Sequence, residues 1–132
     1  MKDPKYLRPF HSDQAVILIA EDEAMVQNIV RIALEGDGYF LLTAHDGEAA
    51  LEISRSFPGT IHLLLTDITM PRLNGIELCR RIAKERPDCR VLIMSGNPRE
   101  DGFRVPFLQK PFTLTSLQDS IESLLGPISA LQ

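Results

Sequence analysis

Five polar residues directly follow apolar segments of the chain, and their chemical types suit the handling of phosphate. Glu21 and Asp22 follow segment 15–20, Asp67 follows 61–66, Ser95 follows 90–94 and Lys110 follows 105–109. Three carboxylates brought together repel one another unless a cation joins them. Oxygen ligands without cysteine or histidine favour a hard ion, and few protein ligands supplemented by water favour Mg²⁺ over Ca²⁺. With Lys110 as a compact positive charge and Ser95 as a hydroxyl donor, the set holds what phosphoryl transfer to a carboxylate requires.

These five residues can meet only if the apolar segments before them are parallel strands of one sheet. Uninterrupted apolar segments are typical of strands covered on both faces, and the chain has five of them: 15–20, 39–44, 61–66, 90–94 and 105–109. Apolar residues at helical spacing lie between or after them, over 23–35, 46–57, 73–86 and 114–125. This alternation predicts an α/β fold with a flavodoxin-like, doubly wound sheet of five parallel strands in the order 2-1-3-4-5. The carboxyl ends of the strands then share one edge, where strands 1 and 3 flank the crevice. Pro106 places the fifth strand at the side of the sheet.

Length and composition restrict the classes of function. The 132 residues suit one domain, predicted over 14–127, with an N-terminal extension at 1–13 and a tail at 128–132. The net charge of −4 and the lack of a basic run argue against a nucleic-acid partner and against an anionic membrane surface. No segment has the pattern of a signal peptide or the length of a membrane span, so a cytoplasmic protein is expected. Cys79 and Cys89 lack the spacing of a metal site, and Cys79 is expected in the core.

Four segments of the sequence together resemble the receiver domain of two-component response regulators, the family of the bacterial chemotaxis regulator. They read AEDE (20–23), LLTDITMPRLNGIEL (64–78), VLIMSG (91–96) and FLQKPF (107–112), and the resemblance covers residues 15–125. The ordered set is specific because every segment lies at the end of a predicted strand. The resemblance implies a phosphoacceptor signalling domain rather than an enzyme, with at most slow self-dephosphorylation. Its partners would be a histidine kinase or a histidine phosphotransfer protein and a downstream protein, and it would be a monomer or a weak dimer.

The resemblance also implies a role for each residue at the strand ends. Asp67 would be the phosphoacceptor, Lys110 the lysine of the family, and Ser95 the switch hydroxyl that moves toward the phosphoryl group. Asp22 would bind Mg²⁺ directly and Glu21 through water, while the backbone carbonyl of Thr69 would join Asp67 as a further ligand. The Lys110–Pro111 peptide bond is expected to be cis, although trans is the usual form. Thr69 and Met70 would lie near the path of the hydrolysing water and so tune the lifetime of the phosphoryl group.

The sequence departs from the family at two places. Phe107 stands where the family often has a switch tyrosine, so it either signals by packing of its ring or is a buried strand residue that does not switch. The segment GNPREDGFR (96–104) is too short and too rich in glycine for a full helix. We therefore predict that the fourth helix is short or absent, which would remodel the surface that often carries the output in relatives.

Three other functions fit parts of the pattern. A small phosphatase with an aspartyl-phosphate intermediate, similar to haloacid dehalogenases, would need a second acid where Thr69 stands. A flavodoxin-like electron carrier would need a hydroxyl- and glycine-rich first loop, and Glu21-Asp22-Glu23 would repel its phosphate. A receiver that acts without phosphorylation remains a further alternative. The three histidines, His11, His45 and His62, lack acid or cysteine partners at ligand spacing and are expected at the surface or in strands.

Overall fold

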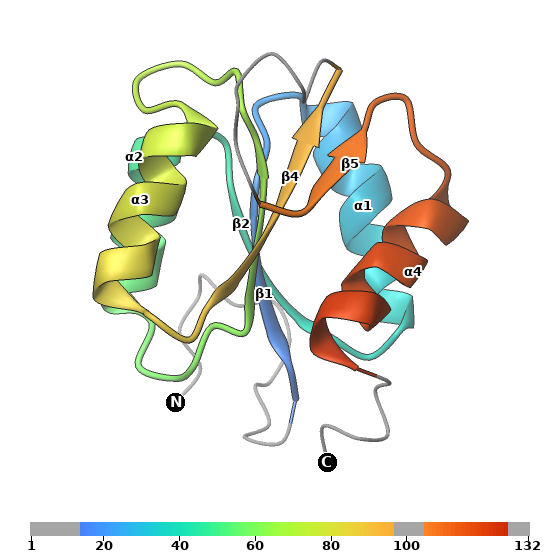
Figure 1. The fold of residues 1–132 in the computed structure, drawn as a ribbon, viewed down its shortest axis with the longest axis horizontal. Coiled ribbons are helices and arrows are strands. Elements are labelled where there is room, and N and C mark those ends of the chain that lie inside the picture. The colour runs from blue at the N-terminus through green and yellow to red at the C-terminus, as the bar shows by residue number, and fades with distance from the viewer. Residues whose placement is uncertain (1–13, 97–104, 127–132) are drawn as a thin grey trace.

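Five parallel strands form one central sheet in the computed structural model, which describes residues 14–96 and 105–126 (Figure 1). The strands are β1 (Val16–Ala20), β2 (Phe40–Ala44), β3 (Leu63–Asp67), β4 (Arg90–Ser95) and β5 (Phe107–Gln109). Their order is β2-β1-β3-β4-β5, and every neighbouring pair is parallel. The predicted fold class, strand order and lateral position of the fifth strand are therefore confirmed.

Two helices cover each face of the sheet, so the molecule has three layers (Figure 1). The helices are α1 (Ala24–Gly36), α2 (Gly47–Ser56), α3 (Gly75–Glu85) and α4 (Leu114–Leu125). Side chains alternate along β1: Val16, Leu18 and Ala20 pack in the core under α2 and α3, whereas Ile17 and Ile19 pack in the core under α1 and α4. All five are completely buried, which is why β1 is apolar without interruption.

Side-chain caps begin three of the four helices. Asp46 accepts a hydrogen bond from Ala49 N, Asn74 from Glu77 N, and Thr113 from Ser116 N. Such a cap stabilises a helix by about 1 kcal/mol. Helix α1 begins differently, because Glu23 occupies the capping position without a side-chain capping bond. Other contacts therefore stabilise the start of α1, and they are described below with the site.

Strand ends differ from the predicted ones by one or two residues. β3 and β4 extend further than expected, so that Asp67 and Ser95 are their last residues, and β5 begins after Pro106. The prediction of a short or absent fourth helix concerns residues 97–104, which lie outside the described residues. No helix within 14–96 and 105–126 is both long enough and apolar enough to cross a membrane.

Arg86 ties the end of α2 to the end of α3. Its guanidinium donates to the carbonyl oxygens of Ser54 (2.7 Å), Gly59 (2.8 Å) and Phe57 (2.9 Å), and to the Ser54 hydroxyl (3.0 Å). The last carbonyls of a helix have no partner within the helix. Arg86 therefore supplies bonds that α2 cannot make itself, and it fixes the two helices relative to each other.

Candidate functional site

Lys110 joins two acidic residues at the carboxyl edge of the sheet. Its Nζ lies 2.9 Å from Glu21 Oε1 and 3.1 Å from Asp67 Oδ2, although the residues are 89 and 43 positions away in sequence. β1 and β3 are neighbours, so Glu21, just after β1, and Asp67, at the end of β3, come together. Lys110 follows β5 directly and reaches across from the side of the sheet. The predicted convergence of these three residues is observed.

Glu21, Asp22 and Asp67 form a cluster of carboxylates. Each offers an oxygen within 4.8 Å of an oxygen of the other two. Glu21 is completely buried, Asp67 is partly buried and Asp22 is exposed, so water can reach one side of the cluster. Three carboxylates next to one ammonium leave two negative charges, which is the charge that one divalent cation balances. The donor set, all oxygen and open to water, fits Mg²⁺.

The surroundings of Glu21 disfavour its ionised form. Burial raises the pKa of Glu21, and the charge of Asp67 raises it further, against the lowering effect of the Glu23 N–H and of Lys110. Burial alone would lower the pKa of Lys110, but hydrogen bonds to Glu21 and Asp67 outweigh it and raise the pKa. The lysine is thus held as a cation, and it does not fully relieve the cost of ionising Glu21. A bound cation would favour the ionised carboxylates.

Hydrogen bonds fix the turn between β1 and α1. Glu21 N donates to Ala44 O at the end of β2 (3.1 Å), and Glu23 N donates to the second carboxylate oxygen of Glu21 (3.1 Å). Gln27, from α1, donates through Nε2 to Ala44 O (2.9 Å) and to Glu21 O (3.3 Å). Gln27 is not among the residues predicted at the site. A polar residue on the apolar side of a helix is the pattern that could have predicted it.

Ser95 and Lys110 are neighbours through the backbone. Ser95 is buried at the end of β4, and its carbonyl accepts a hydrogen bond from Lys110 N (2.8 Å). The Lys110–Pro111 peptide bond is cis, as the resemblance implied. The hydrogen bond between Lys110 N and Ser95 O holds the backbone of the lysine beside the end of β4.

Phe107 is 45% exposed, so the alternative that it is a buried strand residue is wrong. Side chains alternate along β5, and Leu108 takes the inward position in the core under α1 and α4. Phe107 therefore lies on the opposite face of this outer strand. The expectation that the ring of Phe107 signals by a change in its packing stays a prediction.

The loop between β3 and α3 packs closely against its surroundings. Gly75 N donates to Ile68 O (2.8 Å), and Arg72, in the left-handed region at φ 70°, forms an ion pair with Asp46 (2.7 Å). Of the two residues expected near the water path, Thr69 is exposed, whereas Met70 is 8% exposed and packs in the core under α2 and α3. Of these two residues, Thr69 is therefore the one at the surface.

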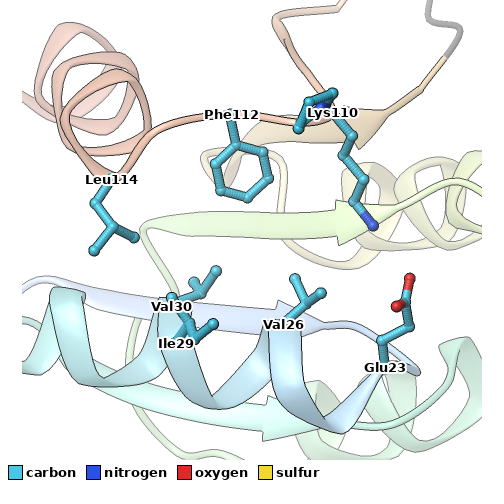
Figure 2. A pocket seen from close by; sticks show the side chains of 8 residues that line it. Glu23, Val26, Ile29, Val30, Lys110, Phe112 and Leu114 are labelled. Atoms are coloured by element: carbon cyan, nitrogen blue, oxygen red, sulfur yellow. The ribbon is translucent and has the colours of Figure 1, made fainter.

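An apolar pocket of about 450 Å³ adjoins the acidic cluster (Figure 2). Val26, Ile29 and Val30 rise from α1 toward Phe112 and Leu114 in the segment after β5, and Glu23 and Lys110 close one end. Outside the residues that line the pocket, α1 also exposes Met25 (76%) and Ile32 (63%). Of the five exposed large apolar side chains among the described residues, three lie on α1 and Leu114 lines the pocket, whereas Phe107 lies on β5.

Neither of the two described histidines belongs to the acidic cluster, and the prediction that they lie at the surface or in strands holds for His45 only. His45 is exposed. His62 is partly buried before β3, where its Nδ1 accepts a hydrogen bond from Val16 N (2.9 Å). His11 lies outside the described residues. Cys79 is buried in the core, and burial raises its pKa to about 12, in agreement with a structural role.

The chain is similar in sequence to proteins of two-component systems. It matches the response regulator receiver domain over residues 17–122. It is 38% identical to the response regulator receiver protein CpdR of Brucella abortus, with 83% of this chain and 95% of CpdR covered. It is 33% identical to the sensor kinase CckA of the same organism, where 86% of this chain covers only 13% of the kinase. The chain thus spans nearly all of one relative and a small part of the other.

Solved structures support the same assignment. The response regulator TrrA of Thermotoga maritima, solved in complex with Mg²⁺-BeF, superposes with a TM-score of 0.76 at 26% identity, over 85% of this chain and all of that one. The receiver domain of the hybrid histidine kinase CckA superposes with a TM-score of 0.75 at 35% identity, over 84% of this chain and 99% of that one. Family match, relatives and fold agree, and we conclude that the chain belongs to the response regulator receiver domains of two-component systems.

Proposed function

We propose that the chain is a phosphoacceptor that receives a phosphoryl group on Asp67 from a phosphohistidine of a histidine kinase or a histidine phosphotransfer protein. The observation that carries the proposal is the contact of Lys110 Nζ with Asp67 Oδ2 inside a cluster that also holds Glu21 and Asp22. Phosphoryl transfer to a carboxylate requires a nucleophilic carboxylate, a cation and a divalent ion, and the proximity of Asp67, Lys110 and further carboxylate oxygens supports the proposal.

Asp22, Asp67, the carbonyl of Thr69 and, through water, Glu21 would hold Mg²⁺. When bound, the ion supplies positive charge for the carboxylates and for the phosphoryl oxygens. The Asp67 oxygen attacks phosphorus in line, and the bond between phosphorus and the donor's imidazole nitrogen breaks. Its electron pair returns to the imidazole, which takes up a proton, and Asp67 becomes an acyl phosphate. Lys110 and the Ser95 hydroxyl then contact phosphoryl oxygens, in roles that we assign by resemblance to the family.

Phosphorylation would change the surface through β4 and β5. The Ser95 hydroxyl moves toward the phosphoryl group, and the backbone bond between Ser95 O and Lys110 N couples this movement to the end of β5. Phe107, half-exposed on β5, then repacks. Coupling of this kind amounts to ~1–3 kcal/mol, enough to change contacts with a downstream protein. Slow attack of water on phosphorus releases inorganic phosphate and restores the Asp67 carboxylate.

The pocket beside the site supports a protein as the phosphoryl donor. A soluble domain rarely leaves large apolar side chains exposed together without a partner, and here Met25, Ile29 and Ile32 lie on α1, the helix that also lines the pocket. Lys110 belongs both to the pocket and to the acidic cluster. A helix of the donor with apolar residues on one face would cover this surface while its phosphohistidine reaches Asp67.

Intact-protein mass spectrometry after incubation with acetyl phosphate and Mg²⁺ tests the proposal. The wild type should gain the mass of one phosphoryl group, and Asp67→Asn should gain none. Asp119→Asn, on the exposed surface of α4, is the matched control and should behave like the wild type. Removal of Mg²⁺ with a chelator should prevent the modification. An adduct on Asp67→Asn, or steady turnover of a small phosphate ester, would contradict the proposal, and the second result would favour the phosphatase.

A wild type that binds the metal without forming an adduct would instead favour a receiver that acts unphosphorylated. No feature of the described residues supports the phosphatase specifically, since Thr69 occupies the position where its second acid would be required. The Glu21-Asp22-Glu23 turn likewise offers no cradle for a flavin phosphate.

A further inference from the structure

Gln27 is a polar side chain buried inside the helical layer. It lies on α1 and is 6% exposed, on the same side of the helix as the core residues Val30 and Leu34. Burying an amide without hydrogen bonds is unfavourable, because the group loses the hydrogen bonds that it makes with water. Its Nε2 is satisfied by two carbonyl oxygens, of Ala44 at 2.9 Å and of Glu21 at 3.3 Å. Neither acceptor belongs to α1, so the bonds do not serve the helix itself.

The two acceptors define the turn that carries the acidic pair. β1 ends at Ala20, so residues 21–23 lie beyond its strand pairings. Glu21 is instead held on both sides: its N–H donates to Ala44 O and its carbonyl accepts from Gln27. Because Gln27 bonds to Ala44 O as well, one amide group connects the start of α1, the turn after β1 and the end of β2.

We propose that Gln27 is a positioning residue that sets the backbone of Glu21 and Asp22, and thereby the affinity of the carboxylate cluster for a divalent cation. The inference rests on the proposed function of the cluster as a Mg²⁺ site. Gln27 bonds through its side-chain amide to main-chain carbonyls and acts on the cluster through the turn. Mg²⁺ requires near-ideal octahedral geometry with short bonds, and the three carboxylates are here up to 4.8 Å apart. A turn left free to shift would have to be ordered again each time the ion binds.

Gln27→Met tests this role, because it keeps the length and bulk of the side chain and removes the donors. The dissociation constant for Mn²⁺, measured from the electron paramagnetic resonance signal of the free ion, should rise by about tenfold, the size of effect seen when partners that orient metal ligands are lost. Leu34→Ala is the matched control. It removes a buried side chain two turns further along α1, outside the pocket, and should lower thermal stability without changing the dissociation constant.

The outcomes separate the inference from the function on which it rests. Wild-type protein that fails to bind Mn²⁺ would refute the proposed metal site, and the inference with it. Wild type that binds, with Gln27→Met equal to it in affinity, would overturn the positioning role alone. An equal rise in Leu34→Ala would also overturn it, because any loss of stability would then produce the effect. Should Gln27→Met not fold, Gln27→Asn withdraws the amide by one methylene, and an unchanged affinity there would refute the role.

Discussion

Gly75→Ala is expected to displace Asp67, the residue that we propose as the phosphoacceptor. Gly75 is the first residue of α3, and a Cβ added there would lie 2.0 Å from Asp67 O, 2.9 Å from Asp67 C and 3.0 Å from Ile68 Cα. All three are backbone atoms, so rotation of a side chain cannot relieve the overlap. Carbon and carbonyl oxygen normally come no closer than about 3.3 Å. The chain at Asp67 and the start of α3 must therefore move apart by about 1.3 Å, the difference between that separation and 2.0 Å.

A displacement of this size should affect reactivity more than stability. Misplacing a reacting group by 1 Å can cost about 10²-fold in rate, whereas overfilling a packed site costs about 1–3 kcal/mol. We therefore expect phosphorylation of Gly75→Ala by acetyl phosphate to be roughly 100-fold slower per folded molecule. The rate comes from a mass-spectrometric time course, and the folded fraction comes from urea unfolding followed by circular dichroism.

Gly36→Ala is the matched control for this substitution. Gly36 ends α1, and a Cβ added there meets no atom within 4 Å. Alanine is favoured over glycine in helices by up to about 1 kcal/mol. This variant should be as stable as the wild type or more so, and it should be phosphorylated at the wild-type rate. If Gly75→Ala reacted as fast as Gly36→Ala, the close approach of Gly75 to Asp67 would not be what positions the acceptor.

Two further predictions concern stability. Arg86→Ala should lower the free energy of unfolding by roughly 4.5 kcal/mol, since three carbonyls each lose a charged donor worth about 1.5 kcal/mol. Urea unfolding measures this, and Arg80→Ala on the exposed side of α3 should change little. Burial, and then the charge of Arg90, lowers the pKa of His62 from 6.5. At pH values between the lowered pKa of folded His62 and 6.5, this histidine is protonated in the unfolded chain but not in the folded chain. The contribution of His62 to stability is therefore full above pH 6.5 and is lost as the pH falls through the folded pKa. Stability should decline less steeply with acid in His62→Gln than in the wild type or in His45→Gln, and equal slopes in all three would contradict this.

The convergence at the sheet edge was predictable because it depends on topology alone. Five apolar segments fix the number of strands, parallel pairing places their carboxyl ends together, and Glu21, Asp67 and Lys110 need only follow those ends. The exact last residues of β3 and β4 were not predictable, because polar residues can extend a strand when a neighbouring strand supplies the bonds. This extension changed the assignment of Asp67 and Ser95 by one residue without moving them from the edge.

The contacts of Gln27 and Arg86 could not be predicted for a different reason. Both side chains bond to main-chain carbonyls in distant elements, and every residue type carries a carbonyl, so no pattern of residue types marks the partner. Phe107 and Met70 illustrate a related limit. Both are large and apolar next to the site, yet one is half-exposed and the other is in the core. Which side of the chain faces inward at these two positions depends on the position of β5 and on the path of the loop after β3.

The bonds of Lys110 to Glu21 and Asp67 link the last strand of the sheet to the first and third. During synthesis, a ribosome must therefore produce all of β5 before the earlier carboxylates receive their fixed counter-charge. A nascent or proteolytically shortened chain that ends before Lys110 would keep Asp67 and Glu21 but lack the ammonium group that contacts both. If Asp67 is the phosphoacceptor that we propose, such a chain would carry the acceptor without its fixed counter-charge.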